Sequence, residues 1–156
     1  MKYQAIKTLS FMLLLAALPA PAARAQQRQN IGGTWKMNPA KSKFELGAPQ
    51  ALTIDLDQQG TAVKESLRIV GPEGERVVKF NYTLDGKEQV NKVESGEVKI
   101  TARWEGDSLL FELKTDQGYS YRRKIMISED GKTMTINLEE LFATGTRKDT
   151  IVLEKQ

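Results

Sequence analysis

Two charged side chains stand in phase with apolar positions of strand-like segments. Glu65 comes two residues after Val63, and Arg123 comes two residues after Tyr121. Alternate residues of a strand share a face, so both charges fall on the apolar face. An unpaired charge in an apolar interior is costly. An inward Arg123 therefore needs Glu65, a tyrosine hydroxyl or a bound carboxylate, which a guanidinium grips bidentately. The alternative is a bulge that reverses the parity and leaves Arg123 in solvent.

Other candidate catalytic groups are weak. The chain contains no histidine and no cysteine, which removes the commonest general base, the thiolate nucleophile and the usual zinc ligands. Glu139 and Glu140 are adjacent, so on a strand they face opposite sides and form no acid/base pair. Asp55 and Asp57 share a face that reads as solvated, with cation binding as the second interpretation. We expect no enzyme, no cofactor and no metal site.

The elements that must position these residues follow a period of two. Leu52, Ile54 and Leu56 alternate with polar residues, and similar segments recur to the end of the chain. Turn signals fall near positions 60, 72, 85, 96, 106, 118, 131 and 145. This spacing of about 8–12 residues is typical of an antiparallel meander, and no stretch shows a helical period.

Such a meander predicts an all-β fold. About eight to ten hairpin-linked strands leave two exposed edges unless the sheet closes on itself. The prediction is a single antiparallel up-and-down β-barrel, with a two-sheet sandwich as the alternative. A barrel of this size is either filled by side chains or leaves room for one small ligand. The interior faces would carry Leu52, Ile54, Leu67, Phe80, Tyr82, Ile100, Phe111, Tyr121, Ile125 and Met134.

Three segments carry a resemblance to a known family. Gly33-Thr34-Trp35 resembles the G-x-W motif of the lipocalins and their calycin relatives. More closely, residues 33–44 resemble the opening of small exported bacterial lipocalin-like proteins. Their W-x-G-D-x-L and D-G-K-T-x-T-I patterns have counterparts at 104–109 and 130–136.

The resemblance implies roles for three residues and for the barrel. Gly33 and Trp35 would open the first strand, with the tryptophan plugging one end. An arginine from a late strand packs on that tryptophan in lipocalins, and Arg147 is the counterpart in phase with Ile151. The family carries small ligands, so a lipocalin-like carrier is implied here.

The first 25 residues read as a cleavable signal peptide. Lys2 and Lys7 precede a short apolar run over 11–18, and Ala23-Arg24-Ala25 is an A-x-A cleavage site. The run is shorter than the ~20 residues of a membrane-spanning helix. We expect a flexible lead-in over 26–32, a barrel domain over 33–156, and an exported protein in the periplasm or the medium.

Removal of this leader changes the charge balance. Its basic residues are Lys2, Lys7 and Arg24, and the rest of the chain carries 20 basic and 20 acidic residues. A nucleic-acid-binding protein shows a clustered basic excess, so no nucleic-acid partner is expected.

These observations predict an exported barrel that binds a small hydrophobic or amphipathic ligand in its interior. Arg123 would orient any acidic head group. The alternative is a filled barrel that acts on a cell-envelope protein through its loops or a strand edge. The predicted ligand-binding residues are Glu65, Phe80, Tyr82, Phe111, Tyr121, Arg123 and Ile125.

Overall fold

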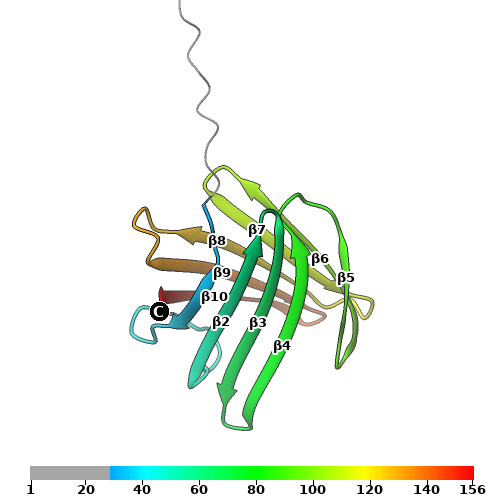
Figure 1. The fold of residues 1–156 in the computed structure, drawn as a ribbon. Coiled ribbons are helices and arrows are strands. Elements are labelled where there is room, and N and C mark those ends of the chain that lie inside the picture. Colours follow the sequence, from blue (N-terminus) through cyan, green and yellow to red (C-terminus); the bar gives the residue numbers. More distant parts are fainter. Residues whose placement is uncertain (1–28) are drawn as a thin grey trace, which may run out of the picture.

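A computed structural model describes residues 29–156 of the 156-residue chain as ten β-strands (Figure 1). The strands are β1 (Gly33–Met37), β2 (Ala51–Gln59), β3 (Ala62–Gly71), β4 (Gly74–Thr83), β5 (Gln89–Val93), β6 (Gly96–Glu105), β7 (Ser108–Thr115), β8 (Ser120–Ile127), β9 (Thr133–Phe142) and β10 (Gly145–Lys155). The predicted signal peptide and residues 26–28 lie outside the described residues.

All ten strands form one antiparallel sheet in the order β4-β3-β2-β1-β10-β9-β8-β7-β6-β5. Neighbours in sequence pair with one another except β4 and β5, and β1 also pairs with β10, which joins the first strand to the last. In Figure 1, β2–β4 cross in front of β6–β10, so the sheet curls around a shared core. The predicted up-and-down barrel is confirmed, and the sandwich alternative is not the arrangement found.

Strand pairing does not close the barrel completely, because β4 and β5 form the two edges of the sheet. One side chain connects them. The Asn81 backbone N–H donates to Asn91 Oδ1 at 2.6 Å, and Asn91 Nδ2 donates to the Asn81 carbonyl at 2.9 Å. The amide thus takes the place of a neighbouring strand's peptide group. We call this junction the β4–β5 seam.

One end of the barrel is packed around Trp35. Its side chain is fully buried, and the indole Nε1–H donates to the Ile31 carbonyl at 2.9 Å. Ile31 is also fully buried. Ile31 was expected within a flexible lead-in, but it packs in the core because an isoleucine next to the barrel buries its apolar surface.

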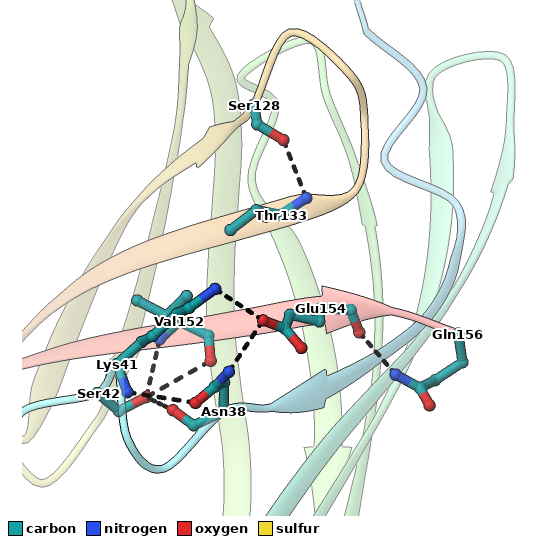
Figure 2. Close-up of polar contacts among 8 residues, drawn as sticks. All are labelled: Asn38, Lys41, Ser42, Ser128, Thr133, Val152, Glu154 and Gln156. Carbon is teal, nitrogen blue, oxygen red and sulfur yellow. Dashed lines mark hydrogen bonds and ion pairs between the residues drawn. The ribbon is translucent and has the colours of Figure 1, made fainter.

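The β1–β2 connection, residues 38–50, is held against β10 by the polar residues of the resemblance segment (Figure 2). Ser42 Oγ donates to the Asn38 carbonyl at 2.8 Å and accepts from the Val152 N–H at 3.0 Å. Asn38 Nδ2 and Lys41 Nζ both donate to Glu154 Oε1, at 2.9 and 3.0 Å. These residues therefore fix the loop and leave Ser42 engaged in structure.

Candidate functional site

An ion pair crosses the interior of the barrel between β3 and β8. Arg123 Nη1 lies 2.7 Å from Glu65 Oε1, and Nη2 lies 3.1 Å from Oε2. The Tyr82 hydroxyl donates to Glu65 Oε2 at 2.9 Å. Arg123 is 5% exposed, and Glu65 and Tyr82 are each 3% exposed. A buried charge pair of this kind persists because each charge is bonded to its partner.

Aromatic rings enclose the guanidinium. Arg123 Cζ lies 3.8 Å from the centroid of the Phe111 ring and 5.5 Å from that of Tyr121. The Phe111 and Tyr121 rings stack with centroids 5.8 Å apart, and Tyr82 meets Phe111 edge-on at 5.0 Å. Arg123 is paired with Phe111 across β7 and β8. The ring faces therefore stabilise the cation within the apolar interior.

These surroundings hold both groups in one protonation state. Burial, the largest single influence, lowers the pKa of Arg123, but the charge and hydrogen bond of Glu65 together with Tyr121 and Tyr82 raise that pKa above its usual value. Burial, followed by the Glu65 charge, raises the pKa of Tyr82 well above its usual value. The guanidinium stays charged and the phenol stays neutral, which suits a fixed polar layer better than proton transfer.

The partner of Arg123 is therefore resolved among those that the sequence left open. Glu65 binds it, and a tyrosine hydroxyl binds the same carboxylate. The alternative of a parity-reversing bulge is wrong, because Arg123 points inward in register with buried neighbours. Regular pairing through β8 keeps the alternation intact.

Beyond this layer the barrel is hollow. An open cavity of about 1100 Å³ lies at the end opposite Trp35. Its lining comes from the β3–β4 turn region, the β5–β6 turn region and the ends of β7, β8 and β9. The lining residues are Ser66, Leu67, Arg68, Arg76, Val77, Val78, Lys79, Phe80, Lys92, Val93, Glu94, Ser95, Val98, Leu113, Thr115, Tyr119, Tyr121 and Phe142.

Strand register places the ion pair at the boundary between the hollow and packed halves. On β8, Tyr121 lines the cavity on one side of Arg123, whereas Ile125 on the other side is buried in the core. On β3, Leu67 lines the cavity and Val63 is buried in the same way. Glu65, Arg123, Tyr82 and Phe111 thus form a layer beneath the cavity, which we call the floor.

The predicted ligand-binding residues divide between the two halves. Phe80 and Tyr121 line the cavity. The other five are all buried, and they belong to the floor or to the packed half: Glu65, Tyr82, Phe111, Arg123 and Ile125. Strand parity indicated that all seven face inward, but parity carries no information on height along the barrel.

A second polar cluster braces the wall between β8, β9 and β10. The Tyr119 hydroxyl donates to Glu140 Oε1 at 2.7 Å, and Arg147 Nη1 lies 3.4 Å from Glu140 Oε2. Arg147 also bonds Asp149, whose other oxygen accepts from the Glu45 N–H at 3.0 Å. Sequence reasoning missed this cluster, although Asp149 is in phase with the buried residues of β10.

The predicted contact between Arg147 and Trp35 is wrong. The cation over the Trp35 ring is Lys155, with Nζ 5.2 Å from the ring centroid. Trp35 is paired with Lys155 across β1 and β10, whereas Arg147 is paired with Glu140 across β10 and β9. Register therefore places Arg147 eight residues from the tryptophan's partner.

Two further features are absent from the described part of the chain. No helix between residues 29 and 156 is long and apolar enough to cross a membrane. In the same range, no group of three or more acidic residues is placed to hold a metal ion.

Comparison with known proteins identifies the fold. No protein-family model and no curated protein matches the chain. Zebrafish ileal bile acid-binding protein, solved with cholic acid, matches with a TM-score of 0.57 at 19% identity over 81% of this chain and 98% of its own. The REP1-NXSQ fatty acid transporter gives 0.56 at 13% over 81% and 96%. A SAHS protein from Ramazzottius varieornatus gives 0.61 at 13% over 80% and 94%.

At these identities the similarity shows the fold alone. The chain has the all-β barrel fold of these three proteins.

Proposed function

We propose that this protein binds a small hydrophobic or amphipathic molecule in the open half of its barrel. The main observation in support of this proposal is the cavity of about 1100 Å³ above the floor. Ligand sites are usually concavities of ~300–1000 Å³ with apolar walls and a few polar groups. Here the walls include Val78, Phe80, Val98 and Leu113.

Desolvation of the ligand's apolar part supplies the binding free energy in this proposal. Burial is worth about 25 cal/mol per Å² of apolar surface. The floor offers no free charge, because Arg123 is neutralised by Glu65. Two neighbours of the same fold are, by name, a fatty acid transporter and a bile acid-binding protein, which supports a hydrophobic ligand.

The alternative, a filled barrel acting on an envelope protein, is less favoured. The half around Trp35 is filled, but the half above the floor is not. The same neighbours favour a binding protein over an enzyme. We also propose, from the sequence of residues 1–25, that the protein is exported and belongs with the small lipocalin-like proteins it resembles.

Native mass spectrometry tests the binding proposal. The protein would be purified from an exporting host without detergent, and any co-purifying hydrophobe would be extracted and weighed. We expect a bound mass, or uptake of a fluorescent fatty acid at micromolar concentration. The N-terminal residue of the same sample tests export, because cleavage after Ala25 predicts a chain that begins at Gln26.

A pair of variants locates the bound molecule. Val78→Trp would fill the cavity from its wall, because Val78 faces the interior beside Phe80. Val90→Trp adds the same bulk at an exposed position of β5 outside the cavity. Loss of uptake in the first variant alone supports the proposal, and unchanged uptake in both contradicts it.

A further inference from the structure

The charged residues around the cavity are unevenly distributed. Four of the lining residues are basic and only Glu94 is acidic: Arg68, Arg76, Lys79 and Lys92 are the basic ones. Two of these have partners on the outer surface, since Arg68 pairs with Glu75 at 3.4 Å and Lys92 reaches Glu97 at 4.0 Å. Arg76 and Lys79 form no ion pair with any residue between 29 and 156.

Arg76 has the more informative position. It lies on β4 in phase with Val78 and Phe80, so its side chain starts from the interior face of the strand. Its strand partner is Ile69 on β3, which packs partly buried against the core. Arg76 is exposed, and it lies beyond the last half-buried residue of that face. A cation thus stands at the mouth, directly above the apolar wall.

The floor is a poor site for an anionic head group. Both guanidinium nitrogens that face Glu65 are already bonded to its carboxylate. A ligand carboxylate that took this place would leave the Glu65 carboxylate buried with only the Tyr82 hydroxyl as a partner. Removal of one partner from a buried charge pair is strongly unfavourable. The free cation is at the mouth.

We propose that the cavity takes an anionic amphiphile with its head group outward on Arg76 and its tail pointing to the floor. This rests on the proposed function and specifies its ligand class. Phe80 lies four residues after Arg76 along β4, a rise of ~13 Å. An extended chain advances roughly 3.3–3.6 Å per three bonds, so a tail of about ten to twelve carbons spans that distance.

Calorimetric titration with three probes of equal chain length tests the assignment. The probes are dodecanoate, dodecanol and dodecyltrimethylammonium, each kept below the concentration at which it forms micelles. We expect dodecanoate to bind most tightly. Its affinity should fall with added salt, because salt screens the attraction between the head group and the exposed Arg76. We expect dodecyltrimethylammonium to bind most weakly.

Variants identify the residue. Arg76→Gln should weaken dodecanoate binding roughly fivefold to tenfold and leave dodecanol within twofold, because only the charged head loses a partner. Arg76→Lys should restore part of the loss. Arg122→Gln is the matched control: it removes the same charge from an exposed arginine that does not line the cavity, and should change neither affinity.

The outcomes separate the two proposals. Failure of all three probes to bind would refute the proposed function together with the head-group assignment. Equal affinities for dodecanoate and dodecanol, or an equal loss for both in Arg76→Gln, would leave the proposed function standing and overturn the outward orientation.

Discussion

At the scale of single residues, the Glu65–Arg123 pair is the feature that divides the interior. It joins β3 to β8 through a carboxylate that also accepts from Tyr82. Buried pairs of this kind contribute little net stability relative to an apolar replacement, but one partner without the other is costly. The pair therefore maintains a polar layer that is neutral as a unit.

This layer predicts a strongly non-additive mutational cycle. Glu65→Leu alone should lower the free energy of unfolding by about 3–5 kcal/mol, since it leaves Arg123 buried without its partner. The double variant Glu65→Leu/Arg123→Met should cost less than the two single losses combined. Urea unfolding of all four proteins measures the cycle.

An exposed pair provides the comparison for that cycle. Arg122 Nη2 lies 2.7 Å from Glu112 Oε1 at the outer surface, and Arg122→Gln should cost only about 0–1 kcal/mol. A small, additive effect at Glu65 and Arg123 would show that the pair is hydrated and does not form a dry floor.

Tyr82 predicts a loss of stability at high pH. Burial raises its folded-state pKa above the unfolded value of 10.0, so the folded protein keeps a proton that the unfolded chain releases. The resulting stabilisation is fully present below pH 10 and is lost as the pH rises further. Each such group contributes a slope of about 1.4 kcal/mol per pH unit.

The Tyr82→Phe variant isolates this contribution. Urea unfolding above pH 10 should give a shallower decline for the variant than for the unaltered protein, by up to about 1.4 kcal/mol per pH unit. Tyr121, whose pKa burial raises to about 12, remains in both proteins. Identical slopes would contradict the assigned burial of the Tyr82 hydroxyl.

The sequence correctly predicted which face of its strand each of these residues occupies, but it did not predict their positions along the barrel axis. Alternation correctly placed Glu65, Arg123 and Phe80 on the interior face. It could not show that Phe80 lines a cavity while Ile125 lies in the packed half. Height and cross-barrel partners depend on how a sheet curls, which a local pattern with a period of two does not specify.

At the scale of elements, the start of β1 is conformationally constrained. Gly33 has a φ of +128°, in a region that L side chains rarely adopt. It leads directly to Trp35, which seals the packed end under Lys155. The glycine of the G-x-W motif therefore has a conformational reason here, and the tryptophan has a packing reason.

Gly33→Ala should consequently destabilise the protein by about 1–3 kcal/mol, because alanine is strained at this φ. Gly71→Ala is the matched control: its backbone is not in the left-handed region, and an added Cβ meets no atom within 4 Å. The control should be neutral or slightly stabilising. Thermal unfolding compares the two, and equal changes would contradict the role given to Gly33.

The β4–β5 seam predicts a local opening. Asn91→Ala removes both bonds to the Asn81 backbone, and should cost about 1–3 kcal/mol through groups left without partners. Hydrogen exchange at the Asn81 amide should accelerate. Lys92→Ala, one residue away, should leave that amide protected. Unchanged exchange in Asn91→Ala would show that the seam is held by other contacts.

Sequence patterns predicted the strands but not how they join. Turn residues and alternation were sufficient for the meander, because both are local signals. The seam depends on one asparagine in a short strand, and the cation over Trp35 depends on the β1–β10 register. The family resemblance predicted that Arg147 packs on Trp35, whereas the pairing of β1 with β10 places Lys155 there.

At the scale of the whole molecule, the protein is a barrel with one filled end and one open end. Trp35 and the residues around it pack the first, and the cavity above the floor occupies the second. With no disulfide available in a chain without cysteine, the packed half must supply most of the stability. The residues of the open half are then less constrained by stability and can be suited to a ligand.

The most direct test is a titration of the isotope-labelled protein with dodecanoate, followed by backbone amide NMR shifts. We expect shifts at cavity residues such as Val78, Val98 and Leu113, with little change at Leu109 and Leu153 in the packed half. Shifts confined to the outer surface or spread over the packed half, or none at all, would contradict a binding site in the open half of the barrel.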